Sequence, residues 1–260
     1  MKYLSITFDD GRADNYEIAY PIMKHYGLSG TIYCTTGYID GSWQPTKWKS
    51  AGRPISTEQL HELQKAGWEL GLHGDKHITD VDDLHTALIK MNEWGFHAKS
   101  FGFSMPDSVS IENKYNEFVR TYHGKEILYI RKGRKRDTGK LTSKLLFAGY
   151  SVLGCQTAYN YFNNPNVIKK DQIDTKNIYT VVIRNEDSPQ MIVRFLKQLP
   201  EDTWVVFMLH SILPETHPLY GADSWNWSKK KFNAFCLSIK SMINEGNMSV
   251  KPVSVIINNP

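Results

Sequence analysis

Short apolar runs alternate with segments of helical spacing along most of this chain. Strands show as apolar or alternating runs, and helices as apolar positions three and four residues apart. The pattern predicts strands at residues 3–8, 30–35, 68–73, 98–103, 126–130, 178–184, 204–210 and 250–257. It predicts helices at residues 14–26, 56–67, 82–94, 188–199 and 229–244. Strands that alternate with helices indicate an α/β fold whose parallel sheet is closed, or nearly closed, into a barrel.

Two long segments have no clear period. Residues 36–55 are predicted to be a long loop, and long loops in compact domains are often functional. Residues 138–174 give no readable pattern. Since no repeat, low-complexity tract or linker divides the sequence, we expect a single catalytic domain over residues 1–260.

Three predicted strands end in polar residues that could act together. Asp9 and Asp10 end the first strand, His73 ends the third with His77 shortly after it, and His210 ends the strand at 204–210. In a β/α barrel the carboxyl ends of the strands meet at one rim. Adjacent carboxylates repel each other, and a bound cation would resolve that repulsion. One carboxylate and two imidazoles leave coordination positions open for water and substrate.

Each of these features also has an ordinary interpretation. Asp9 and Asp10 alone could form a turn or cap the next helix. His73 and His77 could be ordinary loop residues, and they meet at one ion only if the backbone between them turns, as in one turn of helix. Together with the end of the strand at 204–210, however, the pattern favours a metal site.

These residues resemble the NodB-homology polysaccharide deacetylases, or carbohydrate esterase family 4. Residues 7–11 (Thr-Phe-Asp-Asp-Gly), the His-x-x-x-His of residues 73–77 and residues 209–211 (Leu-His-Ser) are similar to the family's first, second and last motifs. The resemblance implies a distorted (β/α)7 barrel and a metal-dependent hydrolase that removes an acetyl group from an N-acetylated sugar. It implies that Asp10, His73 and His77 bind a divalent metal, most often Zn²⁺, that Asp9 is the general base, and that His210 is the general acid.

The chain departs from the family pattern at several positions. Gly74 stands where family members usually have Ser or Thr. Residues 100–106 resemble the third motif but lack the arginine that would orient the base. Arg131 or Arg184, each close to the end of a predicted strand, could replace it, and each could equally be a surface residue. The fourth motif is not recognisable, and Asp187 is the candidate carboxylate beside His210.

Composition limits the partners and the compartment. A net charge of +4 requires no nucleic-acid partner, and no stretch has the length of apolar sequence that a membrane helix needs. Met1 leads straight into the first strand without a secretory signal, which favours a cytoplasmic protein, although a chain whose signal had been removed would look the same. Cys34, Cys155 and Cys236 are expected to be reduced and not to bind zinc.

The substrate can be predicted only by class. Trp43, Trp48, Trp225 and Trp227 could stack on sugar rings or anchor their loops as buried indoles. The basic run at residues 131–136 would favour an anionic sugar, linked to a nucleotide or a lipid, if it faces the rim; otherwise it is a solvated loop. This indicates a role in the synthesis of bacterial surface polysaccharide, such as lipopolysaccharide. Two alternatives remain: hydrolysis of another linear or cyclic amide, and a catalytically inactive carbohydrate-binding domain.

Overall fold

The computed structural model describes residues 1–78, 80–104, 109–134, 145, 148–149, 152 and 166–258. The predictions for Met105, Pro106, residues 135–136, Cys155 and most of residues 138–174 lie outside that part of the chain. The strands are β1 (Lys2–Phe8), β2 (Thr31–Cys34), β3 (Glu69–Leu72), β4 (Ser100–Gly102), β5 (Tyr129–Arg131), β6 (Ile168–Lys169), β7 (Val181–Val182), β8 (Thr203–Leu209), β9 (Ser211–Leu213), β10 (Asn226–Ser228) and β11 (Met248–Val250). The helices are η1 (Asn15–Ala19), α1 (Tyr20–His25), α2 (Thr36–Ile39), α3 (Thr57–Lys65), α4 (Val81–Glu93), α5 (Val109–Tyr122), η2 (Lys170–Gln172), α8 (Pro189–Gln198), α9 (Lys229–Asn244) and α10 (Val253–Asn258).

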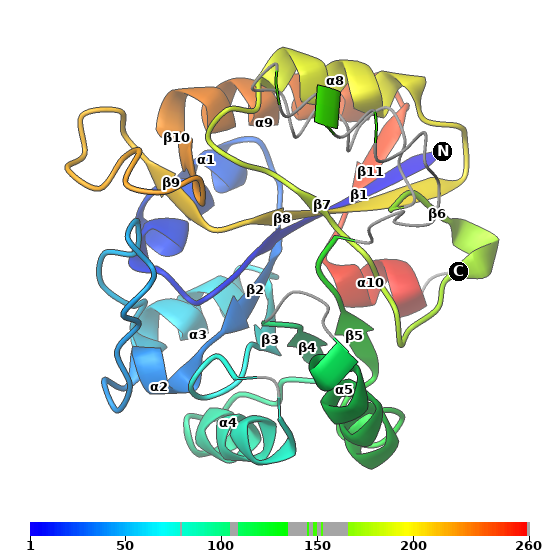
Figure 1. Cartoon of the computed structure of the whole chain (residues 1–260). Helices are drawn as coiled ribbons and strands as arrows, with labels where there is room; N and C mark the ends of the chain where they lie inside the picture. Colours follow the sequence, from blue (N-terminus) through cyan, green and yellow to red (C-terminus); the bar gives the residue numbers. More distant parts are fainter. Residues whose placement is uncertain are drawn as a thin grey trace.

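The main sheet curls into a distorted (β/α)7 barrel (Figure 1). Its strands follow the order β5-β4-β3-β2-β1-β8, and all pairs along this path are parallel. The segment around Ile178 joins the two edges of the sheet, because Ile178 bridges to Arg131 at the end of β5 and β7 then pairs with β8. The predicted fold class is confirmed.

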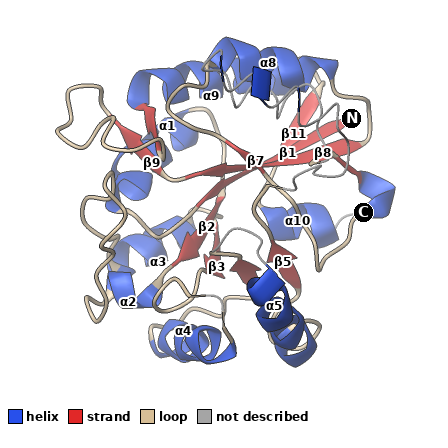
Figure 2. Ribbon diagram, in the orientation of Figure 1, coloured by secondary structure: helices blue, strands red, loops and turns tan. Residues whose placement is uncertain are grey.

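Alternating side chains of the strands build two separate apolar cores. One face of β1, Leu4, Ile6 and Phe8, packs against helices such as α9 outside the barrel (Figure 2). The other core contains Tyr33 and Trp204 with Val253 and Ile256 of α10. Since α10 supplies residues to this second core, it closes the amino-terminal end of the barrel. All seven residues of β8 are buried, as expected for a strand covered on both faces.

Several predicted elements agree with the structure. Helix α9 covers the predicted residues 229–244, and Ser56 and Gln59 form a capping box at the start of α3. Two predictions need correction. The predicted loop at residues 36–55 begins with a short helix, α2. The segment predicted as one strand at 250–257 ends its strand at Val250 and continues as α10.

The closing segment is helical because tertiary contacts override its β-branched sequence. Pro252 precedes α10 and lacks the N–H that a continuing sheet ladder would use. The next two amides donate to side chains of the barrel, Val253 N to Thr31 Oγ1 at 3.2 Å and Ser254 N to Glu69 Oε2 at 2.9 Å.

Helix α5 was not predicted at all. No helix among the described residues is long and apolar enough to cross a membrane.

Candidate metal centre and acid–base site

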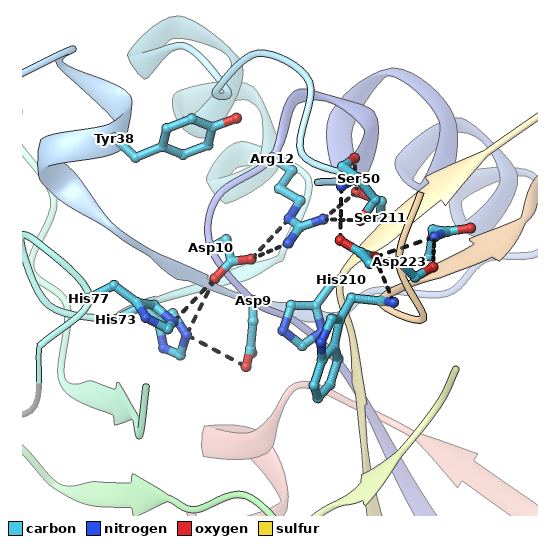
Figure 3. Close-up of polar contacts among 12 residues, drawn as sticks. Asp9, Asp10, Arg12, Tyr38, Ser50, His73, His77, His210, Ser211 and Asp223 are labelled. Carbon is cyan, nitrogen blue, oxygen red and sulfur yellow. Dashed lines mark hydrogen bonds and ion pairs between the residues drawn. The ribbon is translucent and has the colours of Figure 1, made fainter. Parts of the chain in front are cut away.

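Asp9 and Asp10 lie at the rim, where β1 ends and the chain turns. The Asp9 amide still donates to the Leu209 carbonyl at 2.9 Å, so Asp9 continues the β1–β8 ladder. Asp10 and Gly11 both adopt a left-handed backbone, with φ of 76° and 79°. Such a conformation costs a non-glycine residue about 1–2 kcal/mol. Both carboxylates are buried, and both approach His73 (Figure 3).

The two predicted histidine ligands meet Asp10 at the end of β3. His73 Nε2 and His77 Nε2 each lie 3.6 Å from Asp10 Oδ1. The other ring nitrogen of His73, Nδ1, lies 2.7 Å from the Gly102 carbonyl oxygen, which fixes the tautomer with Nε2 free. The intervening backbone is not the expected turn of helix: it bends sharply, with left-handed Gly74 and His77.

The donor set fits a divalent cation. One ligand atom from each of Asp10, His73 and His77 lies within 4.8 Å of the others. Asp10 Oδ1 is buried and has no hydrogen-bond partner among the described residues, and such an orphaned atom calls for an explanation. Burial lowers the pKa of both histidines, which keeps the imidazoles neutral and their lone pairs available.

Sequence reasoning missed Arg12, which is buried beside Asp10. Its Nε and Nη2 contact Asp10 Oδ2 at 2.9 and 2.7 Å, from the side opposite the histidines (Figure 3). Burial alone would raise the pKa of Asp10, but above all the charge of Arg12 holds it well below its usual range. Arg12 Nη1 also donates to Ser50 Oγ and Ser211 Oγ, at 3.0 and 2.7 Å. The available signal was a cation placed directly after the Asp-Asp-Gly turn.

Arg131 supplies the arginine that the third motif lacks. Its Nη2 contacts Asp9 Oδ1 at 2.5 Å, and the side chain is fully buried with its guanidinium 4.6 Å from the Tyr33 ring. A Cβ at Gly102 would lie 2.5 Å from Arg131 Nη2, so glycine on β4 leaves room for the arginine. The surface interpretation of Arg131 is therefore wrong, as is its place in a solvated basic run. Arg184 is half-buried and stacks over Trp225 instead.

His210 follows β8 and reaches the same rim (Figure 3). Its carbonyl accepts a hydrogen bond from Asn15 Nδ2 at 2.7 Å, and its ring centroid lies 4.5 Å from that of Trp225. Burial lowers the pKa of His210 to about 4, against the attraction of Asp10 and Asp9, so the imidazole is neutral at pH 7. Within the described part of the chain, Nδ1 of His210 has no hydrogen-bond partner, so the expected Asp187 carboxylate does not bind there.

The four candidate tryptophans divide into two groups. Trp227 is buried in the core and donates through Nε1 to the Asp187 carbonyl, so of the two interpretations the buried indole is confirmed at this position. Trp43, Trp48 and Trp225 are only partly buried. Trp48 stands edge-on to His77, with ring centroids 4.8 Å apart, and so borders the candidate metal site. The buried Cys34 and Cys236 are free thiols, as expected.

A curled parallel sheet with this rim defines a β/α barrel that carries a candidate metal centre. The model of the polysaccharide deacetylase family matches residues 1–118, which contain Asp9, Asp10, His73 and His77. The chain is 34% identical over 79 residues to YxkH of Bacillus subtilis (strain 168), a protein named as a candidate polysaccharide deacetylase. That match spans 30% of this chain and 24% of YxkH. The predicted resemblance to the polysaccharide deacetylases is confirmed over residues 1–118, which the model of that family matches.

A solved structure supports the fold over nearly the whole chain. The family 4 acetyl xylan esterase from Clostridium thermocellum, in complex with a cobalt ion, superposes with a TM-score of 0.51 at 10% identity. The superposition covers 98% of this chain and 90% of the esterase. Arg131 and His210 lie outside the segment that the family model matches, and their placement at the rim comes from the fold alone.

Proposed function

We propose that the chain is a metal-dependent hydrolase that removes the acetyl group from an N-acetylated sugar, and that residues 1–260 form one catalytic domain. The observation that carries this proposal is the buried Asp10 Oδ1, which has no hydrogen-bond partner among the residues that the structure describes and faces two neutral imidazoles. A structural carboxylate would have both oxygens satisfied. The family supports deacetylation, and the ligand types support a divalent cation.

Asp10, His73 and His77 would hold the cation, most often Zn²⁺ in sites of this composition. When bound, such a cation polarises an acyl carbonyl and makes a water molecule acidic enough to attack it near neutral pH. Two contacts already orient the candidate ligands: the Gly102 carbonyl fixes the His73 ring, and Arg12 holds Asp10 Oδ2.

Asp9 acts as the general base and accepts the proton of the attacking water. Arg131 holds Asp9 Oδ1, while Asp9 Oδ2 faces His73 Nε2 at 3.7 Å. This ion pair fixes the carboxylate in one orientation, as efficient proton transfer requires. His210 donates a proton to the departing amine. Since burial lowers its pKa and leaves the imidazole neutral at pH 7, His210 would first take up the proton that Asp9 has accepted and then pass it to the amine.

For the substrate we propose a class of molecule, the N-acetylated sugars. Trp48 beside His77 offers a partly exposed aromatic face or edge to a sugar ring. Within this class we propose an anionic sugar, linked to a nucleotide or a lipid. Its deacetylation would belong to the cytoplasmic synthesis of bacterial surface polysaccharide. Arg131 no longer supports it, because its charge is paired with Asp9.

The decisive experiment is acetate release from a panel of N-acetylated nucleotide sugars and oligosaccharides, with protein reloaded with Zn²⁺ after chelation. We expect acetate only from the reloaded protein. Acetate from none of the sugars, but cleavage of simple linear or cyclic amides, would point to the other hydrolase. If the protein neither hydrolyses any of these compounds nor binds a cation, the result would favour a catalytically inactive carbohydrate-binding domain.

A further inference from the structure

Three backbone amides around the His73–His77 turn converge on one carboxylate that the catalytic proposal does not use. Asp83 belongs to the first turn of α4. Its Oδ1 accepts from Lys76 N at 2.7 Å, and its Oδ2 accepts from Asp75 N and Ile78 N at 3.1 and 3.2 Å. These amides lie on both sides of His77 in the sequence. The carboxylate therefore holds the backbone that carries one of the candidate metal ligands.

The turn leaves no space for a side chain at Gly74. Gly74 has a φ of +84°, and a Cβ there would lie 2.2 Å from Asp83 Oδ2. The hydroxyl residue expected after His73 is absent because the Asp83 carboxylate fills that space. His77 itself has a φ of 55°, which an L-residue adopts at a cost of about 1–2 kcal/mol. Such a conformation persists only when surrounding contacts enforce it.

Asp83 is itself fixed relative to the barrel. Its amide donates to the N-cap side chain of Asp80 at 2.8 Å, and Leu84 and Leu88 of the same helix are buried in the outer core. On the other side of the turn, Asp75 Oδ1 accepts from Thr36 Oγ1 at 2.8 Å, next to β2. Hydrogen bonds thus hold the turn between α4 and the end of β2, and those to Asp83 come from the amides on either side of His77.

We propose that Asp83 is a positioning residue for the candidate metal centre, acting through the backbone to set His77 against Asp10 Oδ1. This inference rests on the proposed function, because it requires that Asp10, His73 and His77 bind a cation. Asp83 touches no candidate ligand side chain in the contacts described. Its contribution is therefore orientation of the ligand and not coordination.

The test measures the affinity for Zn²⁺, by competition with a chromophoric chelator, in the wild type and in Asp83→Asn. Asparagine keeps the size of the side chain but has one acceptor oxygen, and its amide group would face N–H donors. We expect the Zn²⁺ affinity to fall ~10–100-fold, which is the range found when a contact that orients a metal ligand is lost. Asp82→Asn is the matched control, because it removes the same charge from the neighbouring, exposed position in the first turn of α4. Its affinity should match that of the wild type.

A double-mutant cycle with His77→Ala separates positioning from a general structural role. If Asp83 acts through His77, then Asp83→Asn should cost no further Zn²⁺ affinity once the imidazole is gone. Equal losses in both backgrounds would overturn the inference, as would wild-type affinity in folded Asp83→Asn. If the wild type binds no Zn²⁺, the proposed function fails first.

Hydrogen exchange keeps the inference testable if the variant does not fold. In the metal-free wild type, the amides of Asp75, Lys76 and Ile78 should exchange slowly, because the Asp83 carboxylate accepts from each of them. Exchange as fast as that of an exposed loop would contradict the proposed role of Asp83.

Discussion

Each end of the barrel holds a carboxylate, partly buried Glu69 at the amino-terminal end and buried Asp10 at the rim, and the two are partnered differently. At the amino-terminal end, Glu69 Oε1 accepts from Ser100 Oγ at 3.0 Å and Tyr129 OH at 2.5 Å. Glu69 Oε2 accepts from Thr31 Oγ1 at 3.2 Å and Ser254 N at 2.9 Å. Neutral donors thus satisfy both oxygens, and Glu69 links its own strand, β3, to β2, β4, β5 and α10.

At the rim, Asp10 Oδ2 is satisfied by Arg12 while Asp10 Oδ1 has no partner within the described residues. Its neighbours are imidazole nitrogens 3.6 Å away, too distant for hydrogen bonds but suited to share an ion. Removal of a carboxylate from solvent, in part as at Glu69 or fully as at Asp10, does not by itself mark a functional acid. The informative observation is an oxygen that the fold leaves unsatisfied among other ligand atoms.

The largest effect should come from Arg131→Met, which leaves Asp9 buried without its ion-pair partner. Breaking a buried pair in this way costs about 3–5 kcal/mol, and urea unfolding followed by tryptophan fluorescence would measure it. Arg184→Met is the control, because this half-buried arginine stacks on Trp225 and pairs with no carboxylate in the described contacts. It should cost less than about 1 kcal/mol. Equal losses in the two variants would show that Asp9 does not depend on Arg131.

Next in size, Asp9→Asn and His210→Ala should each lower acetate release by about 100-fold or more, because each removes a group that transfers a proton. Metal analysis should find an unchanged Zn²⁺ content in Asp9→Asn, since Asp9 is not a proposed ligand. Asp10→Ala is the contrasting variant and should lose the metal as well as the activity. Wild-type turnover in both acid–base variants would refute these roles.

Asp14 provides a pH-dependent prediction at the same rim. Burial raises its pKa to about 6, although its Oδ1 accepts from Ile212 N at 2.6 Å. Between about pH 4 and pH 6 the folded protein therefore retains a proton that the unfolded chain releases. Protonated Asp14 thus stabilises the folded state at low pH, and the free energy of unfolding falls as the pH rises through this interval. A shift of about two units corresponds to about 1–3 kcal/mol. Asp14→Asn should lack this loss.

The measurement for Asp14 is the free energy of unfolding at pH 4 and pH 7. The stability of the wild type relative to Asp14→Asn should decline across that interval. Asp171→Asn, at an exposed position, should track the wild type at both values. A constant difference between wild type and Asp14→Asn would mean that Asp14 titrates as it does in the unfolded chain.

The smallest effect should come from Glu69→Gln at the other end of the barrel. Gln cannot accept at both former oxygens, and one lost hydrogen bond to a charged group costs about 1–2 kcal/mol in the free energy of unfolding. The Zn²⁺ affinity should stay unchanged, with Glu93→Gln on the exposed end of α4 as the control for both quantities. A fall in Zn²⁺ affinity would break the contrast between the two ends.

The sequence predicts those parts of the site that lie next to strand ends. Asp9, Asp10, His73 and His77 each follow a buried apolar run, so their common rim follows from parallel strands. The partners of Asp9 and Asp10 are harder to predict. Arg131 reaches Asp9 across 122 positions of sequence, and only the closed barrel brings them together. Short-range pattern carries no information about such pairs.

The same reasoning explains the errors in the fold. Residues 250–257 have strand-like composition, yet α10 forms there because Thr31 and Glu69 take the amides at its start. Gly74 stands where a hydroxyl residue was expected, yet the Asp83 carboxylate, which lies next to it in space, accepts the hydrogen bonds of the turn. In both cases a side chain distant in sequence decides a local conformation. Propensity and motif spacing do not contain that information.

The position of β1 at the centre of the sheet also governs the order in which the protein can assemble. Strand β1 leaves the ribosome before the strands that it pairs with, and most of its ladder is made with β8, from Tyr3 paired with Trp204 to Phe8 paired with Leu209. About two hundred residues must therefore be synthesised before Asp9 and Asp10 acquire their final surroundings. Until then β2 is the partner available to β1 in the sheet, through Thr7 with Thr31 and Phe8 with Ile32.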